Sequence, residues 1–144
     1  ALRRGHPALA DWSLARFCAL DHILVSVTGT GLGATDIALA ARGLSRRVAL
    51  WLPHFHAALR MVAETDMTVT LPRSLARDQA KALGLVLVEP PVETPPFTIV
   101  TLWPEALDAD PAHRWLRAQV AEAARAIPAV EPPLRPAGLE PATK

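Results

Sequence analysis

Apolar runs and amphipathic segments alternate regularly along the first two thirds of the chain. Four runs rich in Val, Leu and Ile are apolar at nearly every position, which predicts strands buried on both faces. Between these runs, apolar residues recur at three- and four-residue spacing, which predicts helices that bury one face. The predicted strands are 22–27, 46–53, 66–72 and 85–90, and the predicted helices are 14–20, 34–42, 54–64 and 73–84.

The order of these elements predicts an α/β fold with a mostly parallel sheet. Parallel neighbours need a long crossover connection, and a helix between two strands supplies it. Crossovers between parallel strands are right-handed in nearly all proteins. We therefore predict a mostly parallel sheet that is covered by helices on both sides.

The pattern changes after residue 90. Four prolines in the stretch "PPVETPP" (90–96) predict a stiff connection rather than a tight turn. "FTIVTLW" (97–103) predicts a further strand, and Asp110 with Pro111 forms an N-cap and first-turn pair for a helix over 112–127. Five prolines in the last seventeen residues predict a loosely attached tail over 128–144.

Composition and charge narrow the class of protein. The 144 residues are 51% hydrophobic and 20% charged, which is typical of a globular domain. The net charge of +1 provides no basic footprint for DNA or for an acidic membrane. A single cysteine, Cys18, excludes an internal disulfide, and the chain shows no export signal, so we expect a cytoplasmic protein without a membrane partner.

The stretch "VSVTGTGLGATD" (25–36) reads as a strand, a glycine-rich turn and the start of a helix. Gly29, Gly31 and Ala34 fit the dinucleotide-binding fingerprint G-x-G-x-x-G/A. That fingerprint also needs an acidic residue near the end of the next strand, yet no Asp or Glu lies between Asp36 and Glu64. Two interpretations stay open: a site for another small anion such as a carboxylate, and a turn that needs glycine only for its backbone geometry.

Other candidate chemistry is sparse. His54 and His56 form a His-x-His pair, but no Cys, Asp or Glu lies nearby in sequence to complete a metal site. Cys18 lies on a short apolar segment, where thiols are usually inert, and Asp66 is a lone carboxylate at the edge of a strand. We find no acid–base pair, and we expect no catalytic residue, no metal and no cofactor.

Several segments in fixed order carry a family resemblance: "LRRGHPAL", the glycine turn, "ARGLSRRVALWLPHF", "ETDMTVTLPRSLA", "LGLVLVEPP" and "FTIVTLWP…LDADPAHRWLRAQV". Over residues 1–127 the chain resembles the C-terminal part of the effector-binding domain of LysR-type transcriptional regulators. The resemblance implies a type 2 periplasmic-binding-protein-like lobe II with the returning strand and helix of lobe I. It divides the chain into an outgoing crossover (1–12), effector-binding lobe II (13–90), a return crossover with a lobe I helix (91–127) and a Pro-rich tail (128–144).

The resemblance also implies a function in effector sensing and oligomerisation. It implies a small-molecule effector, for which a carboxylate is one candidate, in a cleft between lobes, and a homodimer or homotetramer. DNA would be bound only through an N-terminal domain that is not in this sequence. The positions matching the family's effector contacts are Ser26, Thr28, Thr30, Pro53, His54, Phe55, Thr65 and Asp66. A fragment of a periplasmic-type solute-binding protein and, less favoured, a nucleotide-binding α/β enzyme are the alternatives.

Overall fold

The computed structural model describes residues 1–95 and 98–127. These residues form two compact units, one made of residues 1–95 and the other of residues 98–127. The tail predicted over 128–144 lies outside the described residues.

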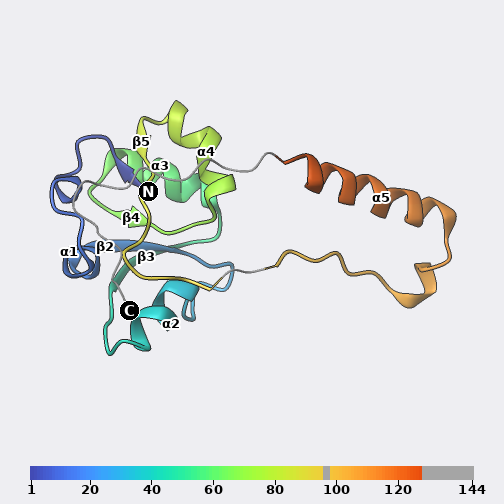
Figure 1. Ribbon diagram of the computed structural model, residues 1–144, viewed down its shortest axis with the longest axis horizontal. Helices are drawn as coiled ribbons and strands as arrows, with labels where there is room; N and C mark the ends of the chain where they lie inside the picture. The colour runs from blue at the N-terminus through green and yellow to red at the C-terminus, as the bar shows by residue number, and fades with distance from the viewer. Residues whose placement is uncertain (96–97, 128–144) are drawn as a thin grey trace, which may run out of the picture. The chain divides into compact units, whose positions relative to one another are not determined.

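A parallel sheet of three strands forms the centre of the first unit (Figure 1). Its strand order is β3 (Arg47–Leu52), β2 (Asp21–Val25) and β4 (Thr68–Val69). β2 pairs in parallel with both neighbours, with His22 opposite Val48 on one side and Thr68 on the other. The three strands therefore end at the same edge of the sheet, as predicted for a mostly parallel sheet.

The fourth predicted strand does not join this sheet. Of residues 85–90 only β5 (Leu85–Val86) is a strand, and it pairs antiparallel with β1 (Leu2–Arg3). The start of the chain explains this difference. The terminal amino group of Ala1 donates to Val69 O (2.7 Å), and Val69 N–H donates back to Ala1 O (3.4 Å), so the first residue lies along the outer edge of β4.

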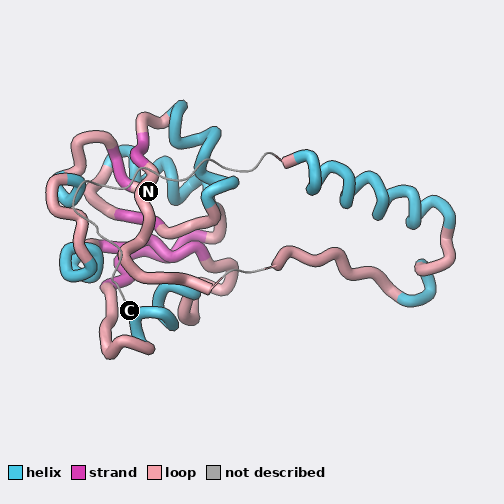
Figure 2. The backbone as a smooth tube through the Cα atoms, in the orientation of Figure 1, coloured by secondary structure: helices cyan, strands magenta, loops and turns pink. Residues whose placement is uncertain are grey.

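The predicted helices of the first unit are confirmed, with small differences at their ends (Figure 2). Ser13 caps the first helix by accepting from the Arg16 N–H (3.2 Å). Gly43, which has a φ of +68°, follows the second helix in the left-handed conformation that favours glycine. The helices are α1 (Leu14–Ala19), α2 (Ala34–Ala40), α3 (Phe55–Glu64) and α4 (Arg73–Ala82), with a short 3-10 turn η1 (Pro7–Leu9) before them.

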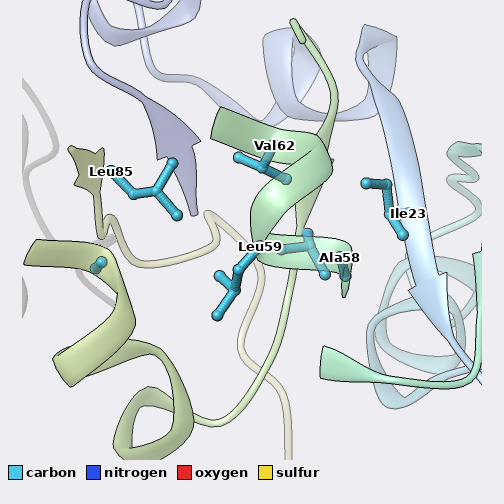
Figure 3. Packing of buried hydrophobic residues seen from close by; sticks show 7 residues of the cluster. Ile23, Ala58, Leu59, Val62 and Leu85 are labelled. Carbon is cyan, nitrogen blue, oxygen red and sulfur yellow. The ribbon is translucent and has the colours of Figure 1, made fainter. Parts of the chain in front are cut away.

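Two apolar cores lie on opposite faces of β2. On one face α3 packs between β2 and β5, and Figure 3 shows Ala58 and Val62 of α3 between Ile23 and Leu85. On the other face the second core is built around α1 and α2, with the members Leu2, Ala8, Trp12, Phe17, Leu39 and Val92. Ile23 belongs to the first core, whereas the centre of the His22 ring lies 4.6 Å from the centre of the Phe17 ring in the second. Successive side chains of β2 therefore point to opposite faces of the sheet. The prediction of helices on both faces is confirmed.

The second unit holds the 3-10 turn η2 (Glu105–Leu107) and the helix α5 (Pro111–Ala126). Asp110 caps α5 by accepting from the His113 N–H (2.7 Å), as the sequence predicts. The guanidinium of Arg117 lies 4.4 Å from the centre of the Trp103 ring and donates to Asp108 O (2.9 Å), which ties the residues before α5 to the helix. The strand predicted at 97–103 is wrong for residues 98–103, which have no strand partner in the described chain; residue 97 lies outside it.

Candidate functional site

The carboxyl edge of the parallel sheet collects most of the predicted site residues. The N–H of Ser26, directly after β2, donates to O of Leu52, the last residue of β3 (2.9 Å). Pro53 follows β3 at the same edge, and Thr70 follows β4 there. Ligands of open α/β sheets bind beyond the carboxyl ends of strands, so this edge is the candidate site.

Residues 26–33, here called the glycine segment, bring three hydroxyl groups together. Ser26 Oγ donates to Thr30 O (3.0 Å) and lies 3.2 Å from Thr28 Oγ1. Thr28 Oγ1 also lies within hydrogen-bond distance of Thr30 O (3.3 Å) and of Thr30 Oγ1 (3.4 Å). Gly29 and Gly31 have φ values of +68° and +96°, so the turn needs glycine there. Thr28 and Thr30 are exposed, and their hydroxyl groups can reach a ligand.

The residues that follow β3 provide an aromatic ring and an imidazole beside the glycine segment. His54 is the N-cap residue of α3 and makes no side-chain capping bond, and its side chain is exposed. Phe55 opens the helix and is half-buried. Among residues 1–95 and 98–127, no group of three His, Cys, Asp or Glu side chains could hold a metal ion, so the His54 and His56 pair has no further ligands there.

Thr65 and Asp66 lie at the opposite edge of the sheet from the other predicted site residues. They precede β4, and β4 runs parallel to β2, so they lie at its amino edge. Asp66 forms an ion pair with Arg3 (2.7 Å), and its backbone O accepts from His6 Nε2 (3.0 Å). Thr65 Oγ1 donates to Met61 O (2.7 Å) at the end of α3. The structure therefore does not bring these two residues to the carboxyl edge with the other six.

Thr70 is the residue that sequence reasoning missed at the carboxyl edge. It directly follows β4 and is half-buried. Strand direction was the available signal, because residues after parallel strands share an edge and residues before them share the other.

The amino end of α2 is already occupied by a carboxylate of the chain itself. Asp36 Oδ2 accepts from the Gly33 N–H at 2.7 Å. Arg46 donates to the same carboxylate through Nε (2.7 Å) and Nη2 (3.0 Å). A nucleotide phosphate at this position would have to displace the Asp36 carboxylate from the Gly33 N–H, which weakens the dinucleotide interpretation. For the same reason, the first turn of α2 gives no support to a carboxylate effector.

His22 completes this buried network and was not singled out by sequence reasoning. Arg46 Nη1 lies 3.1 Å from His22 Nδ1, and His22 Nε2 lies 2.8 Å from Phe17 O. Because a guanidinium only donates, Nδ1 accepts, and Nε2 carries the proton and donates to Phe17 O. His22 is therefore neutral in this arrangement.

Burial governs the pKa values of both titratable members of the network. Burial lowers the pKa of His22 to about 4; the hydrogen bond with Phe17 O opposes this change and the charge of Arg46 adds to it. For Asp36, burial raises the pKa, but hydrogen bonds from Arg46 and the Gly33 N–H, with the charge of Arg46, outweigh it. The pKa of this carboxyl consequently lies below its ordinary value.

The comparison with protein families decides between the alternatives left open by the sequence. The model of the LysR substrate binding domain matches residues 1–125. The chain belongs to this family. It is an effector-binding domain of the kind found in LysR-type transcriptional regulators, and the earlier resemblance is confirmed.

Relatives in this LysR family are transcriptional regulators. The chain is 38% identical over 127 residues to the HTH-type transcriptional regulator SyrM 1 of Sinorhizobium fredii, an alignment that covers 87% of this chain and 38% of that protein. It is 34% identical over 116 residues to the HTH-type transcriptional activator NahR of Pseudomonas putida, covering 80% of this chain and 39% of that protein. The chain thus spans less than half the length of these relatives.

The same fold occurs in the crystal structure of the regulatory domain of MexT, a transcriptional activator in Pseudomonas aeruginosa. The TM-score is 0.60 at 35% sequence identity, and the match covers 78% of this chain and 57% of that one. This likeness confirms the predicted α/β class. In the described part of the chain, no helix has the length and apolar character needed to cross a membrane.

Proposed function

We propose that this LysR-family chain is the effector-sensing part of a cytoplasmic transcriptional regulator. Its residues 13–90 would form lobe II of a two-lobed effector domain, and residues 91–127 would return to lobe I. A small molecule bound between the lobes would shift their packing only as far as its affinity differs between the two arrangements. DNA would be bound by another part of the regulator, because this chain has a net charge of only +1.

The carboxyl edge of the sheet is the proposed effector surface. The observation that carries this proposal is the cluster of exposed hydroxyl groups on the glycine segment, next to the residues that follow β3. The proposed contacts are Ser26, Thr28, Thr30, Pro53, His54, Phe55 and Thr70. Thr65 and Asp66 are left out of this surface, because the Thr65 hydroxyl donates to Met61 O in α3 and the Asp66 carboxylate pairs with Arg3.

Self-association is the second part of the proposal. Leu116, Val120 and Ile127 of the second unit are each about half exposed at 50%, 46% and 58%. An apolar stripe of this kind marks a surface that another segment or another copy covers. We propose a homodimer or homotetramer of the regulator.

A ligand screen with two variants tests the effector surface. A panel of small aromatic and aliphatic acids, with benzoate and succinate as first members, and of matching neutral amides is added to the full chain, and a rise in melting temperature identifies binders. Thr28→Val removes one exposed hydroxyl, and we expect it to weaken the best binder about tenfold, as for a lost ligand hydrogen bond.

Asp66→Asn is the matched control, because Asp66 is exposed and lies at the opposite edge. We expect it to change the affinity less than about twofold. A larger effect of Asp66→Asn than of Thr28→Val would place the effector at the other edge and contradict the proposal.

A further inference from the structure

A buried ion pair lies behind the glycine segment, outside the proposed effector surface. The side chains of Arg46 and Asp36 are 2% and 10% exposed. Two nitrogens of Arg46 meet the two carboxylate oxygens of Asp36, the bidentate geometry that holds a carboxylate in a fixed orientation. The cost of removing two charges from water offsets their attraction, so a buried ion pair adds little to the free energy of folding. Its main effect is to hold neighbouring groups in a fixed orientation.

The pair links the end of the glycine segment to β2 and, through β2, to α1. Asp36 accepts from the N–H of Gly33, the last residue of the segment, and Arg46 reaches His22 on β2. His22 continues the chain of hydrogen bonds to Phe17 O of α1. Every buried side-chain nitrogen and oxygen within the described residues has a partner, so this network is fully satisfied.

The Gly33 end of the segment is also tightly packed. A Cβ at Gly33 would lie 3.0 Å from Leu24 Cδ1 and 3.3 Å from Asp36 Oδ2. The other end is fixed by the bond from Ser26 N–H to Leu52 O. Between these ends the segment is open to solvent, with Val27 88% and Leu32 75% exposed. The position of the hydroxyl groups therefore depends on how well the two ends are held.

We propose that Arg46 is a positioning residue for the effector site. Together with Asp36 it fixes the Gly33 end of the glycine segment and thereby the hydroxyl groups of Ser26, Thr28 and Thr30, without reaching the proposed effector surface itself. The link to effector binding rests on the proposed function, whereas the anchoring of the segment does not.

Amide hydrogen exchange of the full chain, read by mass spectrometry without any added compound, tests the anchor. Arg46→Gln is compared with Arg47→Gln, because Arg47 is the next residue, is 72% exposed and pairs with Asp21 at the surface. Within 26–33 the Gly33 amide donates to Asp36 and the Ser26 amide to Leu52 O, so these are the protected amides to follow. We expect Arg46→Gln to speed exchange of the Gly33 amide about tenfold, and to change α3 peptides less than about twofold. Arg47→Gln should leave both regions within about twofold of the wild type.

A rise in exchange confined to 26–33 would distinguish a positioning role of Arg46 from a general contribution to stability. Unchanged exchange over 26–33 in Arg46→Gln, or an equal rise over α3, would overturn the proposal. If Arg46→Gln does not fold, the double variant Asp36→Asn/Arg46→Met leaves no unpaired buried charge and is read by the same comparison. A screen that finds no binder would count against the proposed function alone, because the exchange comparison uses no compound.

Discussion

At the scale of single residues, the most informative side chains of the first unit are ones whose roles depend on distant partners. Arg46 meets Asp36 ten positions away and His22 twenty-four positions away. No local pattern in the sequence relates these three residues or distinguishes His22 from the other histidines. The glycine turn and the carboxylate three residues after Gly33 are local features of the sequence, but the pairing of that carboxylate with Arg46 could not be predicted, because folding brings Arg46 to it.

The neutral state of His22 predicts a pH dependence of stability. Its pKa is lowered from 6.5 to about 4 in the folded chain, so the unfolded chain binds more protons between these values. Stability that is present above pH 6.5 is therefore lost as the pH falls toward 4. We expect the free energy of unfolding to drop by about 2 kcal/mol between pH 7 and pH 5 from this residue.

Urea denaturation of the wild type and of His22→Gln at pH 7, 6 and 5 checks this prediction. His22→Gln lowers stability at every pH but removes the titration, so its pH slope should be flatter. Parallel slopes for the two chains would show that His22 does not titrate in this way. The lowered pKa of Asp36 acts in the same direction, but below its unfolded pKa of 3.8 and thus outside this window.

At the scale of elements, helices were better predicted than strands, for a physical reason. The apolar stripe of a helix such as α3 is local, and the structure has α3 over Phe55–Glu64 against a predicted 54–64. A strand exists only if another strand pairs with it. β4 is limited to Thr68–Val69 because only these residues pair with β2, and β5 to Leu85–Val86 because only these pair with β1. The local sequence pattern does not show these partners.

The candidate site could likewise be predicted only where a local pattern marks it. Its carboxyl-edge residues could be predicted, because the ends of β2 and β3 lie where the apolar runs stop. Thr65 and Asp66 lie apart from these residues, because residues before a strand and residues after its parallel neighbours lie at opposite edges of a sheet.

Because α3 is buried on one side only, we expect alanine substitutions on its two sides to lower the free energy of unfolding by different amounts. Leu59 is 1% exposed and belongs to the core between α3, β2 and β5, whereas Met61, two positions later, is 39% exposed. Leu59→Ala should lower the free energy of unfolding by about 2–5 kcal/mol, since the cavity adds to the lost burial. Met61→Ala should cost less than about 1 kcal/mol.

Chemical denaturation of the two variants at neutral pH measures the difference. Equal losses for the two variants would contradict the packing of α3 described above. Circular dichroism of the folded variants checks that α3 keeps its helical content.

At the scale of the whole molecule, the first unit is closed by residues that lie just before its end. Val92 is 2% exposed within the core around α1 and α2, and Trp12 Nε1 donates to Glu89 O at 2.8 Å. Leu85 belongs to the core on the other face. The core around α1 and α2 is therefore complete only when the chain reaches Val92, and the core on the other face only when it reaches Leu85 and the adjoining Leu87.

This closure predicts where the chain can be shortened. A fragment that ends after Pro95 keeps both cores, so we expect it to unfold in one cooperative thermal transition and to retain the near-ultraviolet circular dichroism of its buried Trp12. A fragment that ends after Gly84 loses Leu85 and Val92 and the acceptor of Trp12, and we expect it to lose both signals. If the longer fragment also melts without cooperativity, the second unit must contribute packing to the first, and the effector surface would have to be studied only in the longer chain.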